Sequence, residues 1–214
     1  VDPTWTLEIN DLEGYLSSSF TGVTSSPMNF AKEVICNGAQ LTEVVVPEGT
    51  TEVFDAMFRN CKTLAKITLP ASIKRIGTAA FEGSAIESIA LPDALEIISF
   101  NAFKGCENLE EAVIPKTIKA IGFGAYNNCT SLKSVYAFLS DPFTLETSSK
   151  YKNDLPFNDV DQECCLYIPI GTLTKYRTAK WIFPKVQERG TLSITVKGSG
   201  YVTYDGTTVS TGTK

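Results

Sequence analysis

The sequence predicts an α/β solenoid, a right-handed superhelix in which short parallel strands alternate with short helical or 3-10 turns. Three observations predict it: a period of 22 or 23 residues, an apolar column with the periodicity of a strand, and a proline that follows this column in successive units. A fixed period in this range is typical of repeat architectures, in which each unit contacts only its neighbours.

Four segments align in the middle of the chain. They start at Leu41, Leu64, Ile86 and Leu109, so the starts are 23, 22 and 23 residues apart, and a fifth unit opens at Leu132 before losing the pattern. One such unit cannot bury its apolar face alone, whereas stacked units cover one another. We therefore expect each unit to form one rung, with strands spaced about 4.8 Å apart along the stack.

The first half of each unit has the pattern of a strand with one buried face. Positions 4 and 6 are apolar and alternate with residues that point the other way. Position 7 is proline in four units, and because proline cannot donate to a ladder, it is expected to end the strand. The column at position 4 consists of Val44, Ile67, Ile89, Ala112 and Val135, and the prolines are Pro47, Pro70, Pro92 and Pro115.

The second half of each unit carries an aromatic residue at position 18 that follows a small residue or Met57. We expect a short turn of helix here, whose aromatic ring plugs the core. The aromatic column consists of Phe58, Phe81, Phe103 and Tyr126.

The two ends of the chain depart from the period. Residues 138–164 are expected to form a long loop or a distorted rung, and Asp205-Gly206 is a hairpin signal within a small C-terminal β-segment. Because the chain starts at Val1 rather than Met, we expect a processed chain or an excised piece. The expected parts are 1–40, an N-terminal irregular repeat or cap; 41–131, four repeats; 132–190, a degenerate repeat and C-terminal cap; and 191–214, the start of a separate β-module.

The repeat resembles a known family. The motif LxxIxIPxxIxxIGxxAFxGC, present as LAKITLPASIKRIGTAAFEGS and IESIALPDALEIISFNAFKGC, is similar to the BspA-like, or treponemal-type, leucine-rich repeat. The resemblance covers residues 27–189 and implies a leucine-rich-repeat solenoid. It also implies a C-terminal cap in which Tyr176, Trp181 and Phe183 cover the exposed end of the core.

The same resemblance implies a function. Proteins of this family are secreted or surface-exposed proteins of host-associated bacteria, often lipid-anchored, and their known roles are in adhesion to host proteins or other cells. The resemblance implies an extracellular or cell-surface location, and it carries no catalytic residues to transfer.

Composition excludes several classes of function. The chain contains no histidine, which removes the commonest general base and metal ligand. A net charge of −5 without a Lys/Arg cluster gives no indication of a nucleic-acid partner. No apolar run approaches the roughly 18 residues of a membrane span. We therefore expect a non-enzymatic protein without cofactor or metal, acting as a monomer.

The cysteines allow two interpretations. Cys61, Cys106 and Cys129 share position 21. They form either a disulfide or metal ladder or a column of buried thiols. We favour buried thiols, because neither His nor Cys-x-x-Cys accompanies them. Cys164 and Cys165 form either a vicinal disulfide or, as we favour, two thiols of which one faces inward and one outward.

The candidate binding residues are the solvent-side strand positions 3 and 5. If position 4 is buried, they line one open face of the sheet, and solenoids bind ligands on such extended surfaces. We expect this face to hold a protein or glycan ligand; alternatively, the solenoid is a spacer that projects other domains. Phe100 and Phe123 form a second apolar patch or a staple between rungs. The ten face residues are Glu43, Val45, Lys66, Thr68, Ser88, Ala90, Glu111, Val113, Ser134 and Tyr136.

Overall fold

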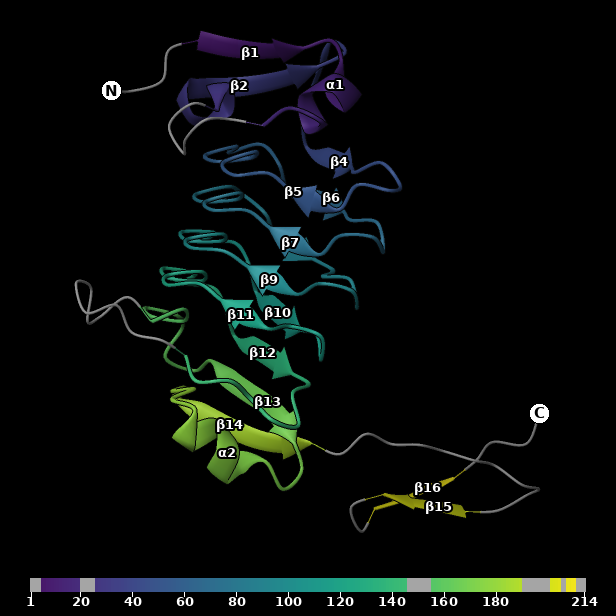
Figure 1. The fold of residues 1–214 in the computed structure, drawn as a ribbon, viewed down its shortest axis with the longest axis vertical. Coiled ribbons are helices and arrows are strands. Elements are labelled where there is room, and N and C mark those ends of the chain that lie inside the picture. The colour runs from purple at the N-terminus through teal and green to yellow at the C-terminus, as the bar shows by residue number, and fades with distance from the viewer. Residues whose placement is uncertain (1–4, 20–25, 146–154, 190–200, 205–206, 211–214) are drawn as a thin grey trace.

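The computed structural model is an elongated stack of rungs with the N-terminus at one end (Figure 1). It describes residues 5–19, 26–145, 155–189, 201–204 and 207–210. Successive units of the sequence lie next to one another along the stack, as expected for a solenoid. The predicted solenoid of short parallel strands is therefore confirmed.

The strands at positions 3 to 6 of successive rungs lie along one side of the solenoid, and we call them together the first sheet. All its neighbouring strands are parallel, and each residue pairs with its equivalent one rung away, for example Val44 with Ile67. Pairing follows the orders β4-β6-β8 and β10-β12-β13-β14. The bounds are β4 Glu43–Val45, β6 Lys66–Thr68, β8 Ser88–Ile89, β10 Glu111–Ile114, β12 Ser134–Ala137, β13 Cys165–Pro169 and β14 Lys185–Arg189.

A second parallel sheet runs along the same stack and was not predicted as strands. Its order is β11-β9-β7-β5, and it contains the apolar position 13, represented by Val53, Ile76, Ile98 and Ile121. The side chains of these four residues point into the same core as position 4 of the first sheet. The bounds are β5 Glu52–Val53, β7 Arg75–Ile76, β9 Ile97–Ile98 and β11 Ala120–Ile121.

The segment predicted as a turn of helix is a chain of hydrogen-bonded turns. In the third rung, N–H groups donate to the carbonyl three residues earlier at Ala102, Lys104 and Cys106. These bonds do not continue as a helix because two intervening residues are left-handed, with φ of 54° at Asn101 and 68° at Gly105. The same two positions have positive φ in all four rungs.

The turns also form a ladder between rungs. The N–H of Phe81 donates to Ala102 O at 2.8 Å, and that of Phe103 donates to Ala125 O at 2.7 Å. The aromatic rings of position 18 consequently stack, with centroids 5.2 Å apart between Phe81 and Phe103 and 5.0 Å between Phe103 and Tyr126. All of these rings are fully buried, as the sequence predicted.

The insertion after β12 ends in a further member of this ladder. Tyr126 N–H donates to Pro156 O at 2.6 Å, and the Phe157 ring stacks on Tyr126 at 5.0 Å. The part of residues 138–164 that the structure describes thus re-enters the stack with its aromatic residue in the same column.

A small cap closes the N-terminal end. Strand β1 (Trp5–Ile9) pairs in parallel with β2 (Ala31–Cys36), and β2 pairs antiparallel with β3 (Ala39–Gln40). Helix α1 (Leu12–Leu16) begins at Asp11, whose carboxylate accepts from Gly14 N–H at 2.9 Å. Tyr15 joins the cap to the first rung by donating to Met57 O at 2.8 Å. A 3-10 helix, η1, spans Pro27–Phe30.

Helix α2 (Leu173–Thr178) and β14 close the C-terminal end. Tyr176 on α2 is buried and donates to Leu139 O at 3.0 Å, and Trp181 Nε1 donates to Phe143 O at 3.0 Å. Phe157 lies 4.9 Å from Phe183 between ring centroids. Of the three aromatic residues of the expected cap, Trp181 and Phe183 thus contact Phe157, the last ring of the ladder, and Tyr176 packs on Trp181.

The C-terminal hairpin consists of β15 (Tyr201–Tyr204) and β16 (Thr207–Ser210), which pair antiparallel. The turn predicted at Asp205-Gly206 and the alternating apolar run from Leu192 to Val196 lie outside the described residues.

Candidate functional site

The ten predicted face residues lie on the solvent side of the first sheet. Seven are exposed, and Val113, Ser134 and Tyr136 are half-buried. Position 4 beneath them is buried in all five rungs, with exposures between 0 % at Val135 and 8 % at Ile89. The alternation that defined this face in the sequence is therefore present in the structure.

The structure brings these residues together in two groups. Glu43, Lys66 and Ser88 are in register on β4, β6 and β8, and the carboxylate of Glu43 pairs with the ammonium group of Lys66 at 2.7 Å. Glu111 and Ser134 are paired on β10 and β12. Between β8 and β10 the strand pairing is interrupted, and Ala90 lies just after β8.

Two residues that the sequence analysis missed extend the second group. Tyr167 on β13 pairs with Tyr136, and their rings stack with centroids 4.7 Å apart and planes 13° apart. The guanidinium carbon of Arg189 lies 4.2 Å from the centroid of the Tyr167 ring, in a cation–π contact. The Tyr136–Tyr167–Arg189 cluster is thus the aromatic end of the face.

A sequence signal for Tyr167 did exist. The run LYIP at residues 166–169 matches ITLP and IALP of the regular units, so Tyr167 occupies position 5 and Pro169 position 7. The insertion between the fifth and sixth rungs hid this register. A hydrogen bond with the Cys165 thiol raises the pKa of the Tyr167 phenol.

The thiol column has no bond between its members. All six cysteines are free, and Cys106 and Cys129 donate to the carbonyl groups of Phe81 and Phe103 at 3.0 and 3.1 Å. Burial raises the pKa of Cys106 to about 11 and that of Cys129 well above its usual value. Protonated, buried thiols of this kind are poor nucleophiles and poor metal ligands.

The cysteine and carboxylate side chains form no metal-binding group in the part of the chain that the structure describes. No group of three Cys, Asp or Glu side chains converges there. Asp161 accepts from Glu163 N–H at 2.6 Å, and Glu163 pairs with Lys185. These carboxylates are therefore engaged in local contacts. Within the same described residues, none of the helices has the length and apolarity to cross a membrane.

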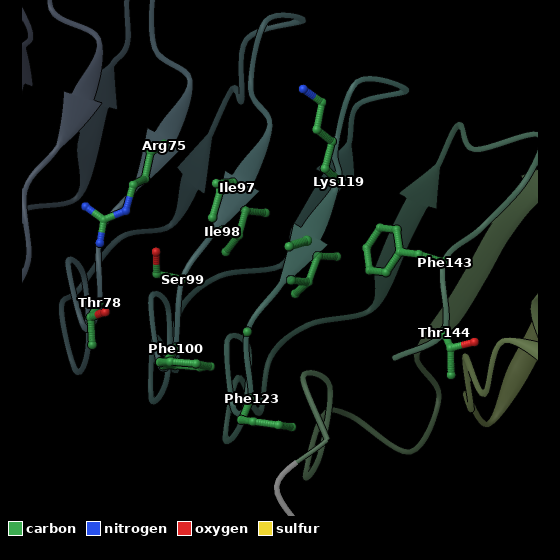
Figure 2. A pocket seen from close by; sticks show the side chains of 13 residues that line it. Arg75, Thr78, Ile97, Ile98, Ser99, Phe100, Lys119, Phe123, Phe143 and Thr144 are labelled. Carbon is green, nitrogen blue, oxygen red and sulfur yellow. The ribbon is translucent and has the colours of Figure 1, made fainter. Parts of the chain in front are cut away.

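A second surface of interest is a groove on the second sheet (Figure 2). Its volume is 530 Å³. Phe100 and Phe123, both at position 15, form one side of it, Lys119 lies on the opposite side, and Phe143 closes the end nearer the C-terminal cap (Figure 2). Ile97 lies on its floor and is 39 % exposed. We call this surface the second-sheet groove.

The two phenylalanine rings are stacked, with centroids 5.5 Å and planes 5° apart. They are thus both a staple between rungs and an exposed patch, because Phe100 is 53 % exposed. Gly122 allows the close approach of the two rungs: a Cβ atom there would lie 2.5 Å from Phe100 N.

Comparison with protein families decides the classification of this repeat. The family described as the BspA type leucine-rich repeat region matches residues 29–149 in six copies. The chain belongs to this family. A BspA-type array therefore supplies the rungs that carry both the face and the second-sheet groove.

Two solved structures are similar to this BspA-type chain. The crystal structure of the pneumococcal vaccine antigen PcpA has a TM-score of 0.55 and 18% identity, over 75% of this chain and 51% of that one. A leucine-rich repeat protein from Bacteroides ovatus has a TM-score of 0.48 and 21% identity, over 78% and 48%. This chain thus spans about half the length of either protein. The comparison with curated proteins finds no match.

Proposed function

We propose that this chain is a non-enzymatic binding module of a bacterial surface protein, which holds a protein ligand on the open face of its first sheet. The observation that carries the proposal is the Tyr136–Tyr167–Arg189 cluster. Tyrosine and arginine are enriched at the energetic centres of protein interfaces, and here they stand together on the sheet, with Arg189 exposed and the two tyrosines half-buried. The likeness to a pneumococcal vaccine antigen agrees with a surface location.

The geometry of the cluster favours a protein over a glycan. A sugar ring would need an open aromatic face to stack on. One face of Tyr167 is covered by Tyr136 and the other by Arg189, so Tyr167 offers its ring edge and hydroxyl group, and Arg189 offers its guanidinium N–H groups. These groups suit the carbonyl and carboxylate oxygens of a protein surface.

The spacer function remains the second candidate because of the C-terminal end. Ile170 and Ile182 are 65 % and 70 % exposed, the highest values among the exposed large hydrophobic residues that the structure describes, and both lie beside α2. A spacer would be expected to have its most apolar surface at its ends, where the next domain docks.

A binding screen separates the two functions. The chain is tested against arrayed host matrix proteins and glycans at physiological salt, together with Tyr136→Ala and the control Ile182→Ala. We expect saturable binding to a protein that Tyr136→Ala weakens on the order of ten-fold or more and Ile182→Ala leaves unchanged.

Three results would contradict the proposed face. Binding that is insensitive to Tyr136→Ala would remove the cluster from the site. Selective binding to glycans would overturn the choice of ligand class. No binding to any target would favour the spacer.

A further inference from the structure

The apolar lining of the second-sheet groove is not required by the fold. The first two rungs show what the stack accepts at the same outward positions: position 12 is Glu52 and Arg75, and position 15 is Asp55 and Thr78. In the third and fourth rungs the same positions are Ile97, Ala120, Phe100 and Phe123. The backbone pairing of β5, β7, β9 and β11 is the same throughout. Rungs one and two are therefore an internal control for rungs three and four.

The groove is also accessible. Ile97 and Phe100 are 39 % and 53 % exposed, although both could be polar without loss of a core contact. Large apolar side chains gathered on an otherwise polar monomer mark interaction sites.

The end of the groove is held in place by the C-terminal cap. Phe143 makes an edge contact with Trp181, with centroids 5.8 Å apart, and its carbonyl accepts from Trp181 Nε1. Two residues later, Leu145 N–H donates to Ala179 O at 2.9 Å. Because these bonds fix Phe143 without a ligand, the groove is preformed, which reduces the entropy lost on binding.

The charges beside the groove are already neutralised. Arg75 pairs with Glu52 at 3.1 Å and with Asp55 at 2.8 Å. Lys119 pairs with Glu96 at 2.6 Å, and this hydrogen bond lowers the pKa of Glu96. A charged ligand group would have to displace one of these partners, so an uncharged ligand is complementary to the groove.

We propose that the second-sheet groove is a second binding site, which takes an uncharged segment of a partner protein through aromatic or aliphatic side chains. Ile97 and Phe100 contact the inserted side chains, and Phe143 limits how far the segment extends toward the cap. This site is separate from the face on the first sheet, so either can be correct without the other.

Peptide selection tests the groove directly. A phage-displayed library of random dodecapeptides is selected on the intact chain, and the enriched peptides are synthesised and titrated by fluorescence polarisation. The test variant combines Ile97→Arg with Phe100→Thr, which gives the third rung the residues of the second. The control variant is Tyr136→Ala, on the other sheet. Circular dichroism and the melting temperature establish that each variant is folded.

We expect enriched peptides to contain aromatic or aliphatic residues with little net charge. The Ile97→Arg/Phe100→Thr variant should weaken their binding at least about ten-fold, and Tyr136→Ala should not change it. Loss of binding in Tyr136→Ala alone would place the peptides on the first-sheet face and overturn the groove. Failure to enrich any peptide, or enrichment of charged peptides, would overturn it as well.

A second copy of the chain is the competing occupant. Sedimentation velocity of the native chain and of the Ile97→Arg/Phe100→Thr variant distinguishes it. A dimer that the variant dissociates would show that the groove is a self-association surface and overturn the proposal, whereas a monomer in both cases supports it.

Discussion

The buried aromatic ladder and the second-sheet groove both contain stacked phenylalanine rings, but the two stacks differ in length. The buried ladder runs without interruption from Phe58 to Phe157. The exposed stack consists of Phe100 and Phe123 alone, and its column continues as Thr78 and Asp55 in the earlier rungs.

The difference shows which positions the stack itself constrains. A buried ring has a neighbour above and below, and a missing ring would leave a cavity that closely packed rungs cannot fill. An outward ring has solvent on one side, so polar residues serve equally well there. A residue type that repeats at the same position in every rung is therefore required by folding. An outward position whose residue type varies from rung to rung is not constrained by the fold, and such positions are where a functional role can be sought.

Truncation of one ring in each stack tests this contrast, and it has the largest expected effect. Phe103 is fully buried between Phe81 and Tyr126, so we expect Phe103→Ala to lower the free energy of unfolding by about 3–5 kcal/mol. Phe100→Ala, three residues away on the exposed stack, should cost less than about 1 kcal/mol. Urea unfolding followed by circular dichroism measures both. Similar losses in the two variants would refute the contrast.

The buried thiols at the inward positions are expected to make the stability of the fold depend on pH. Burial raises the pKa of Cys106 from 9.0 to about 11. Because the folded-state pKa is the higher one, the stabilisation is complete below pH 9 and is lost as the pH rises toward 11. We expect Cys106 alone to account for a decrease on the order of 2 kcal/mol over this window.

Serine at the same position provides the control, since Ser84 already occupies this column in the second rung. Cys106→Ser does not titrate in this range, so its unfolding free energy should fall less steeply above pH 9 than that of the native chain. The measurement is a series of urea unfolding curves between pH 7 and pH 11. Equal slopes for the two chains would mean that Cys106 ionises in the folded state without cost.

The contrast between inward and outward positions also explains which parts of the structure could be predicted from the sequence. Inward columns repeat because every rung meets the same neighbour, so the strands at position 4 and the buried ring of Phe103 could be predicted. The second sheet was not predicted as strands, because its elements are only two residues long and such short runs have no visible alternation. The left-handed turn positions were missed too, since Ala56 and Ala79 occupy them as well as Asn and Gly.

The sites were less predictable than the fold. The outward position of Tyr136 followed from its place in the period, but Tyr167 was missed because the insertion lengthens the spacing between the fifth and sixth rungs. Phe100 and Phe123 were singled out from their shared position, as a patch or as a staple between rungs. Phe143 joins them through its ring contact and hydrogen bond with Trp181, which is far away in sequence and has no periodic signal.

Tyr126 is the one member of the regular buried column with a hydroxyl group, and it gives the smallest expected effect. Its ring is stacked on both sides, but its oxygen is buried without a hydrogen-bond partner among the described residues. Tyr126→Phe keeps the stack and removes the unsatisfied group, so we expect it to raise the free energy of unfolding by about 1 kcal/mol.

Tyr176→Phe is the matched control, because the buried hydroxyl of Tyr176 donates to the carbonyl groups of Ala137 and Leu139 at 3.3 and 3.0 Å. Its removal should lower the free energy of unfolding by about 1 kcal/mol. The same loss of one oxygen atom is thus expected to have opposite signs at the two tyrosines. Urea unfolding of both variants measures the signs. A destabilised Tyr126→Phe would indicate that a buried water molecule satisfies the Tyr126 hydroxyl, and the ladder would then contain a polar site.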